Sequence, residues 1–233
     1  MKIIAVGMNY AEHNKEMKNT LLQKEPVIFT KPDSALLRTG RPFFIPDFAE
    51  RFDYECELVV KINRQCRDVS ERFCHRYYRE VTLGIDFTAR DLQDKLRRGG
   101  LPWDLCKGFD NSAAVGRFID KRDLFGIEGC TSMKPEMKSS KGGGSHVSEE
   151  TWRRLMSAIY FRLDIDGRTV QMGHTSDMIH SVDQIISYVS RFMTLKSGDL
   201  IFTGTPAGVG PLHEGEELRG YLGNEEVLEV KIE

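Results

Sequence analysis

Residues 54–62 read Tyr-Glu-Cys-Glu-Leu-Val-Val-Lys-Ile, and this run of apolar and β-branched residues predicts a strand. Successive side chains of a strand point to opposite faces, so Glu55 and Glu57 share one face while Cys56 and Leu58 share the other. Two carboxylates in an otherwise apolar strand are costly to bury unless a cation neutralises them. The alternative is an edge strand with a solvated face.

Working outward from this strand, further short strands and a few helices are expected. Apolar runs predict strands at residues 3–6, 27–30, 43–45, 81–87, 159–165, 169–172, 200–203 and 227–232. Helical patterns cover residues 11–18, 70–78 and 89–98. Many short strands, few helices and no regular βα alternation predict a β-rich α+β domain.

Two local signals are specific. Asp166-Gly167 between two strand patterns predicts a type I′ hairpin turn. Ser181 begins a helix, and Gln184 completes a capping box. The predicted buried stripe of that helix consists of Ile185, Tyr188, Val189 and Phe192.

Length and composition limit the classes of protein to consider. The chain has 233 residues, which predicts one domain over residues 1–233. A net charge of -2 without a basic block argues against a nucleic-acid partner. No apolar run is long enough to span a membrane. Five cysteines, an odd number with no CxxC pair, indicate a reducing compartment. We therefore expect a cytoplasmic protein.

Asp86 ends the predicted strand at residues 81–87 and precedes a helix. By itself it fits a helix N-terminal acid, which the helix dipole favours. Together with Glu55 and Glu57 it offers three hard oxygen ligands, which suit magnesium or manganese rather than zinc. The sequence therefore contains a candidate metal site.

His13 and Glu16 lie three residues apart on a predicted helix and can touch. A carboxylate beside an imidazole fixes its tautomer and makes it a candidate general base for water. The alternative is a solvated helix face.

Other polar residues could contact a substrate near this metal site. Arg90 and Gln93 lie one turn apart on the helix after Asp86, and Arg90 could pair with a carboxylate of the substrate or of the protein. Lys107 is an isolated base after an apolar stretch. In the glycine-rich loop at 204–210, the backbone amides, including that of Gly204, and the Thr205 hydroxyl could hold a carboxylate.

Five motifs occur in order along the chain: GMNYAEHNKE at 7–16, YECEL at 54–58, GIDFTARD at 84–91, GGLPW at 99–103 and TGTPAGVG at 203–210. Together they resemble the fumarylacetoacetate hydrolase family, and most of all its single-domain acylpyruvase and oxaloacetate decarboxylase branch. The resemblance covers nearly the whole chain.

The resemblance implies a mixed β-roll or pseudo-barrel with short flanking helices, usually as a homodimer. It implies Mg²⁺, with Mn²⁺ possible, as cofactor, and a small 2-oxo acid as substrate. The implied metal ligands are Glu55, Glu57 and Asp86. The implied catalytic residues are His13, Glu16 and Lys107, and the implied substrate-binding residues include Gln93 and Thr205.

The activity that the resemblance implies is cleavage of a carbon–carbon bond through a metal-stabilised enolate, by acylpyruvate hydrolysis or oxaloacetate decarboxylation. Two alternatives stay open. One is an isomerase or decarboxylase of unsaturated 2-oxo dicarboxylic acids, of the 2-hydroxyhepta-2,4-diene-1,7-dioate isomerase type. The other is a metal-binding or ligand-binding relative without catalytic activity.

The segment at about 124–154 departs from the family pattern, because relatives connect the flanking elements by a shorter loop. It contains Cys130, Trp152 and a Lys/Ser/Gly tract at 138–145, whose composition cannot form a packed core. We expect a surface insertion that could alter a dimer contact or cover the site.

Overall fold

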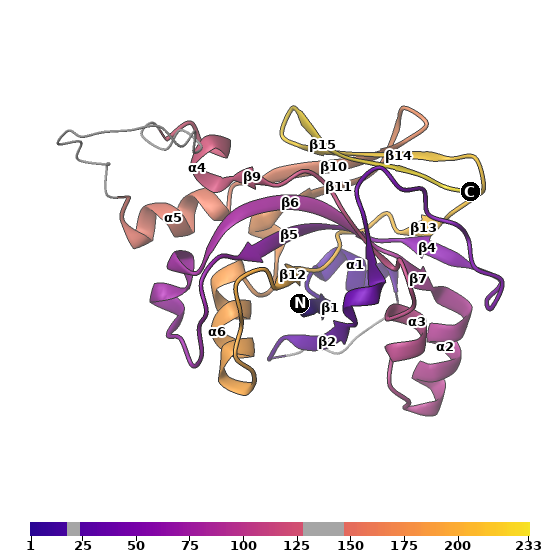
Figure 1. Cartoon of the computed structure of the whole chain (residues 1–233), viewed down its shortest axis with the longest axis horizontal. Helices are drawn as coiled ribbons and strands as arrows, with labels where there is room; N and C mark the ends of the chain where they lie inside the picture. Colours follow the sequence, from indigo (N-terminus) through magenta and orange to yellow (C-terminus); the bar gives the residue numbers. More distant parts are fainter. Residues whose placement is uncertain (18–23, 128–146) are drawn as a thin grey trace.

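A computed structural model describes residues 1–17, 24–127 and 147–233 of the chain (Figure 1). Its largest element is a mixed eight-stranded sheet of order β2-β1-β12-β5-β6-β8-β3, in which β9 also pairs with β6. These strands are β1 (Ile3–Gly7), β2 (Val27–Lys31), β3 (Leu36–Leu37), β5 (Cys56–Ile62), β6 (Tyr78–Asp86), β8 (Ala113–Val115), β9 (Ile119–Asp120) and β12 (Leu200–Phe202).

Two smaller sheets have the orders β11-β10-β14-β15 and β13-β4-β7. Their strands are β4 (Phe52–Tyr54), β7 (Thr88–Ala89), β10 (Tyr160–Ile165), β11 (Arg168–His174), β13 (Gly210–Pro211), β14 (Glu217–Leu222) and β15 (Glu225–Lys231). The large sheet curls beneath the four-stranded sheet into half a barrel (Figure 1). The predicted β-rich α+β class is confirmed.

The helices are short and lie at the margins of the sheets. They are α1 (Ala11–Glu16), α2 (Arg90–Gly99), α3 (Asp104–Lys107), α4 (Lys121–Leu124), α5 (Glu149–Met156) and α6 (Val182–Phe192), with 3-10 turns η1 (Asp33–Ala35), η2 (Glu71–Arg76) and η3 (Thr175–Asp177). In Figure 1, α2 and α3 lie at one end of the molecule, and α4 and α5 lie at the other.

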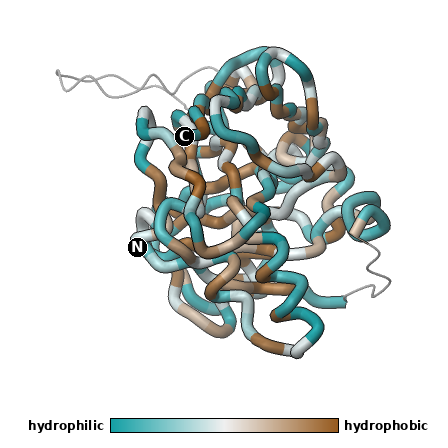
Figure 2. Tube along the Cα trace, turned by 90° about the vertical axis from the view of Figure 1, so that its right-hand side faces the viewer, coloured by the Kyte–Doolittle hydropathy of each residue, from teal (hydrophilic) through white to brown (hydrophobic). Residues whose placement is uncertain are grey.

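The alternation of side chains along each strand divides the interior into two cores, and apolar segments run through the middle of the trace in Figure 2. The larger core includes Leu58 and Leu83 and contains side chains of the four-stranded sheet and α6. The smaller core covers the inner face of the large sheet and includes Val59 and Phe202. Glu57 lies two residues before Val59 and therefore on this inner face.

Gly84 shows how closely the strands of the inner face approach one another. A Cβ atom at this position would lie 2.6 Å from the Phe202 ring and 2.8 Å from Val59 Cγ2. Only glycine fits such a contact without displacing a strand. Gly84 precedes Asp86 by two residues, so the two residues share this face of β6.

The local turn and helix signals are confirmed. Asp166 and Gly167 have φ values of 49° and 77°, as a type I′ turn requires. At the start of α6, the Ser181 hydroxyl accepts from the Gln184 amide, and the Gln184 side chain accepts from the Ser181 amide. Sequence signals that depend on a few neighbouring residues were thus reliable here.

Three predicted elements were wrong in extent or type. The single strand at 54–62 is interrupted at Glu55, because β4 and β5 belong to different sheets. Residues 70–78 form the 3-10 turn η2, and Tyr78 already begins β6. Residues 43–45 form only one parallel bridge, between Phe43 and Ile232, because Pro42 and Pro46 lack the amide donors that a longer ladder needs.

The predicted buried stripe of α6 was wrong at one end. Ile185 and Val189 are buried, whereas Tyr188 is only half-buried and Phe192 is 64% exposed. Val182 and Ile186 are buried instead, so the covered face is rotated toward η2. The helical period was correct, but the sequence alone did not show which flank the protein covers.

The predicted insertion at about 124–154 is described only at its two ends, and Cys130 and the Lys/Ser/Gly tract lie outside the described residues. Phe125 packs on Trp152 with ring centroids 6.4 Å apart. The Lys121 ammonium lies 4.5 Å from the Trp152 ring centroid. These contacts join α4 to α5, at the end of the molecule remote from α2 and α3 (Figure 1).

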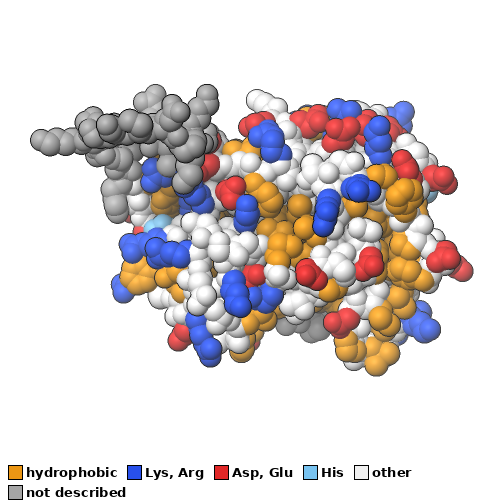
Figure 3. Space-filling model, in the orientation of Figure 1, with side chains coloured by type: hydrophobic (Ala, Val, Ile, Leu, Met, Phe, Trp, Pro, Cys, Tyr) orange, Lys and Arg blue, Asp and Glu red, His pale blue; other side chains and the backbone are white. Residues whose placement is uncertain are grey.

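Basic and acidic side chains are mixed over the face shown in Figure 3, with no large area of one charge. Among the helices that the structure describes, none is long and apolar enough to cross a membrane. Four cysteines lie in the described ranges, and all four are buried free thiols: Cys56, Cys66, Cys74 and Cys106.

Candidate active site

Three buried carboxylates meet at one end of the inner face of the large sheet. Glu55 lies between β4 and β5, Glu57 lies on β5, and Asp86 is the last residue of β6. The register that pairs Glu57 with Gly84 and the hydrogen bond from the Asp86 amide to the Glu55 carbonyl align them. One oxygen of each carboxylate lies within 4.8 Å of the others. The residues are 7%, 1% and 0% exposed, respectively.

Two buried lysines lie against these carboxylates. Lys107 Nζ donates to Glu55 Oε2 at 2.8 Å, to Asp86 Oδ2 at 2.8 Å and to Thr88 Oγ1 at 2.6 Å. Lys31 Nζ lies 2.6 Å from Asp86 Oδ1 and also donates to the carbonyl and hydroxyl of Ser112. Asp86 is therefore held between two ammonium groups, one on each oxygen.

Arg90 lies on the first turn of α2 and is committed to protein acceptors. Its guanidinium donates to Asp53 Oδ2 at 2.7 Å, to Glu55 Oε1 at 2.6 Å and to Gln93 Oε1 at 2.5 Å. The sequence left open whether Arg90 pairs with a carboxylate of the substrate or of the protein, and the structure shows pairing with protein carboxylates. Gln93 is buried beside it and lines the same pocket.

The electrostatics of Glu55 and Glu57 differ. Burial alone would raise the pKa of Glu55, but Lys107 and Arg90 outweigh it and hold that pKa well below its usual range. Burial, with Asp86 and Glu55 adding repulsion, raises the pKa of Glu57 well above its usual range. Glu57 accepts from the Gly204 amide at 2.7 Å and forms no ion pair with any described residue. Three converging carboxylates, one without a cation, fit a divalent ion with oxygen ligands.

His13 and Glu16 come together on α1 at the edge of this pocket. His13 Nδ1 lies 3.4 Å from Glu16 Oε2, and the Gly208 amide donates to both Glu16 oxygens at 3.2 Å. Burial lowers the pKa of His13, although Glu55 and Glu16 act in the opposite direction. The imidazole is therefore neutral at neutral pH, and with Nδ1 donating to Glu16, Nε2 is the free acceptor.

The glycine-rich loop at 204–210 contacts the carboxylate cluster through a hydrogen bond from the Gly204 amide to Glu57. The Gly204 amide holds Glu57, and a Cβ atom on Gly204 would lie 2.7 Å from Asn9 Cβ, with φ at +96°. Thr205 lines the pocket, donates to the Cys56 carbonyl and accepts from Gln171. Gly204 therefore positions a candidate metal ligand, while Thr205 reaches the space where a substrate would lie.

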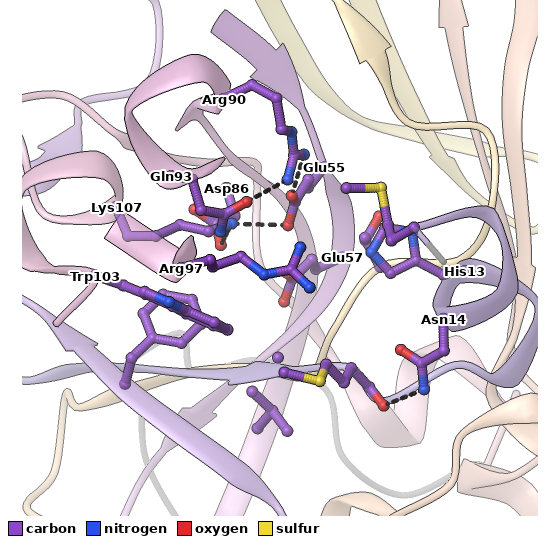
Figure 4. Close-up of a pocket in the computed structure, with 16 residues that line it drawn as sticks. His13, Asn14, Glu55, Glu57, Asp86, Arg90, Gln93, Arg97, Trp103 and Lys107 are labelled. Atoms are coloured by element: carbon purple, nitrogen blue, oxygen red, sulfur yellow. Dashed lines mark hydrogen bonds and ion pairs between the residues drawn. The ribbon is translucent and has the colours of Figure 1, made fainter. Parts of the chain in front are cut away.

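One pocket, shown in Figure 4, is lined by the three carboxylates together with His13, Arg90, Gln93, Lys107 and Thr205. Its floor is formed by the three carboxylates, Lys107 and Arg90, and its walls include Met8, Phe29, Arg97 and Trp103. Trp103 packs edge-on against Phe29, with ring centroids 5.7 Å apart. The pocket thus has a charged floor and partly apolar walls.

The structure brings together every site residue proposed from sequence, and it adds four that were missed. Lys31, Asp53, Gln171 and Arg97 contact or flank the others. Lys31 carried a weak signal, because a lysine ends an apolar strand just before Pro32. Asp53 and Gln171 had none, since their bonds to Arg90 and Thr205 join residues far apart in the sequence.

Comparison with known proteins matches this arrangement to one family. The family model for the fumarylacetoacetate (FAA) hydrolase C-terminal domain matches residues 2–233. The chain belongs to the fumarylacetoacetate hydrolase family. Among the relatives of this family member, the Bos taurus protein named oxaloacetate tautomerase FAHD1, mitochondrial, is 36% identical over 231 residues, covering 99% of this chain and 91% of the relative.

Two further relatives of this fumarylacetoacetate hydrolase family member are informative. Oxaloacetate tautomerase YcgM of Escherichia coli is 35% identical over 217 residues, covering 93% of this chain and 86% of YcgM. A fumarylpyruvate hydrolase of Pseudomonas aeruginosa, solved with Mn²⁺ and pyruvate, has a TM-score of 0.81 and 29% identity, with 100% of this chain and 89% of that chain covered. That relative thus carries a divalent metal and a 2-oxo acid.

Proposed function

We propose that this chain is a divalent-metal-dependent enzyme that transforms a small 2-oxo acid through its enolate, with keto–enol interconversion of oxaloacetate as the first candidate reaction. The observation that carries the proposal is the convergence of three buried carboxylates within 4.8 Å on the floor of a pocket. The Bos taurus and Escherichia coli relatives that bear the name oxaloacetate tautomerase support this choice of reaction.

In this proposal, Glu55, Glu57 and Asp86 hold Mg²⁺ or Mn²⁺. The bound ion supplies Lewis acidity that stabilises negative charge on the 2-oxo oxygen. Oxygen ligands suit both ions, and the Pseudomonas aeruginosa relative contains Mn²⁺. We propose Mg²⁺ as the resident ion.

Lys107 is suited to stabilise the anion rather than to give up a proton. Burial alone would lower its pKa, but Asp86 and Glu55 raise it above the usual value, so the ammonium is retained. Neutral His13, with Nε2 free, is the group suited to move a proton at C3. Gln93, which lines the pocket, would orient the substrate carboxylate, and Thr205 would contribute once its hydroxyl turns from the Cys56 carbonyl to the substrate.

A second candidate is cleavage of a carbon–carbon bond. The pairing of His13 with Glu16 favours its hydrolytic form. The neutral imidazole would take a proton from water, the hydroxide would attack the 4-carbonyl of a 2,4-dioxo acid, and the C3–C4 bond would break with its electron pair going to the enolate of pyruvate. Decarboxylation of oxaloacetate reaches the same enolate without a water-activating base.

The decisive experiment uses protein stripped with EDTA and then reloaded with Mg²⁺ or Mn²⁺. Enol–keto interconversion of oxaloacetate, loss of carbon dioxide and hydrolysis of acetylpyruvate are followed in parallel. Metal-dependent interconversion faster than the other two supports the first candidate, and faster loss of acetylpyruvate supports the second. Rates equal to those of the metal-free protein for all three reactions would contradict the proposal.

Two further parts of the proposal concern the whole protein. We propose a homodimer, as is usual in this family, and light scattering coupled to size-exclusion chromatography measures it.

We also propose a reducing compartment such as the cytoplasm, although the Bos taurus relative bears the name of a mitochondrial protein. The burial of all four described thiols is compatible with that environment.

A further inference from the structure

Three cations line the pocket, and two of them are already paired with buried carboxylates of the protein. Arg90 is bonded to Asp53 and Glu55, and Lys107 is bonded to Glu55 and Asp86. All three N–H groups of Lys107 are bonded to protein acceptors, and the charge of Arg90 is shared between two buried carboxylates. A further carboxylate would compete with these buried ion pairs, which are costly to disturb. Arg97 differs, because its guanidinium forms no ion pair or hydrogen bond with any residue in the described ranges, although its backbone carbonyl accepts from the Gly100 amide.

The position of Arg97 on α2 directs it toward the same space as Arg90 and Gln93. These residues are at i, i+3 and i+7, so their side chains share one face of the helix. In Figure 4 the Arg97 guanidinium extends into the middle of the pocket, between Trp103 and His13. Its Cα lies about 10 Å along the helix axis from that of Arg90. Arg97 therefore enters the pocket from the rim, while Arg90 is part of the floor.

The net charge of the pocket with a divalent ion bound balances that of a dianion. Among the lining residues, the three carboxylates are balanced by three cations, Arg90, Arg97 and Lys107. A divalent ion at the carboxylates then leaves two positive charges. A 2-oxo acid with one carboxylate neutralises only one of them in the ground state, whereas a 2-oxo dicarboxylate neutralises both.

The Arg97 side chain also occupies part of the space in the pocket. With the side chains as they stand, the volume that water-sized groups can occupy in the pocket is about 50 Å³, which holds a few water molecules. The Arg97 guanidinium lies in the middle of the pocket, so withdrawal of this side chain toward the rim would enlarge the space for a substrate. The exposed position of Arg97 at the end of α2 permits this movement.

We propose that Arg97 is a specificity-determining residue that binds the second carboxylate of a 2-oxo dicarboxylic acid and so selects such substrates over monocarboxylic ones. This inference rests on the proposed function. The planar guanidinium can bind a carboxylate through two parallel hydrogen bonds, which gives direction as well as affinity. The 2-oxo end lies at the carboxylate floor, and the far carboxylate lies at the rim where Arg97 enters.

The test compares Arg97→Gln and Arg97→Lys with Arg98→Gln on metal-loaded protein. Arg98 is the matched control, because it lies in the same last turn of α2, is exposed and does not line the pocket. We expect Arg97→Gln to lower kcat/KM for oxaloacetate about 10- to 100-fold, mainly through KM, as loss of a charge-assisted hydrogen bond predicts. Acetylpyruvate should change less than about threefold, and Arg97→Lys should recover part of the loss.

Other outcomes are equally clear. Equal losses with both substrates, or the same loss in Arg98→Gln, would show that Arg97 only stabilises the C-terminus of α2 and would overturn the inference. If the wild-type protein turns over neither substrate, the proposed function fails, and calorimetric binding of oxaloacetate and pyruvate to the Mn²⁺-loaded protein still decides the role of Arg97. A preference for oxaloacetate that Arg97→Gln abolishes supports the inference, and an absent or unchanged preference overturns it.

Discussion

The ammonium group of Lys31 lies 2.6 Å from Asp86 Oδ1, and both side chains are almost completely buried. The opposite oxygen of Asp86 is bonded to Lys107 at 2.8 Å. Burial lowers the pKa of Lys31, while Asp86 opposes that change. Asp86 is thus neutralised by two ammonium groups, one on each oxygen, and removal of Lys31 leaves Oδ1 of the buried carboxylate without its cation.

Lys31→Met is therefore expected to destabilise the metal-free protein by about 3–5 kcal/mol, the range for breaking a buried ion pair. Urea unfolding at neutral pH in EDTA measures the change. Lys61→Met is the control, since Lys61 pairs with Glu80 at 2.9 Å and both side chains are about one-third exposed. Its expected cost is at most about 1 kcal/mol. Similar costs for both variants would show that Asp86 does not depend on Lys31.

Glu57→Gln is expected to have opposite effects on the metal-free and metal-loaded protein. The raised pKa of Glu57 means that its contribution to stability is fully present below about pH 4.5 and is lost as the pH rises through the higher folded-state pKa. At neutral pH the glutamine, which can still accept from the Gly204 amide, should therefore stabilise the metal-free protein.

Thermal unfolding with and without Mg²⁺ tests this prediction. At a free Mg²⁺ concentration of about 100 times its Kd, the wild-type protein should gain about 2.7 kcal/mol, and Glu57→Gln should lose most of that gain. Glu12→Gln, on the exposed face of α1, serves as the control and should keep the full response. A Glu57→Gln protein with an unchanged Mg²⁺ response would remove Glu57 from the ligand set.

His13 should set the acid limb of the pH profile for any reaction that needs a base. Because burial lowers its pKa below 6.5, the imidazole stays neutral as the pH falls through 6.5, and kcat/KM should decline only at lower pH. His13→Gln should reduce hydrolysis of acetylpyruvate at least 100-fold, in the range of about 10²–10⁴ for a general base. His13→Gln should also abolish the decline of kcat/KM at low pH. A decarboxylation that needs no base should be affected much less.

A titration remote from the site should affect folding. Asp183 on α6 is buried near Tyr78 and Lys121, and burial raises its pKa to about 6. Its contribution to stability is complete below about pH 3.8 and is lost as the pH rises through about 6. Relative to wild type, Asp183→Asn should therefore gain up to about 3 kcal/mol between pH 4 and pH 7. Urea unfolding at several pH values measures the difference, and exposed Asp123→Asn should show no such trend.

The sequence was most informative where a feature depends on a short local pattern. The spacing of Glu55 and Glu57 predicted that the two carboxylates act together, and the structure brings them together even though the strand is interrupted between them. The capping box at Ser181 is likewise complete within four residues. Both depend on residues at most three positions apart in the sequence.

The sequence was least informative where a partner comes from another part of the chain. Lys31 contacts Asp86 across 55 residues of sequence, and no periodicity relates them. The exposure of Phe192 depends on which flank of α6 is covered, and the end of β4 at Tyr54 depends on a different sheet partner. The family resemblance supplied the candidate catalytic role of Lys107, which local patterns did not.

The close contact at Gly84 has a consequence for the choice of ion. Gly84 fixes the approach of β6 to Val59 on β5 and to Phe202 on β12, and Asp86 lies two residues further along the same strand. A methyl group at position 84 would push β6 outward and change the separation between Asp86 and Glu57. Mg²⁺ needs oxygen atoms at about 2.0–2.1 Å, whereas Ca²⁺ accepts about 2.3–2.6 Å. In the proposed metal site, discrimination between ions of different radius would thus depend partly on a glycine that is not a ligand.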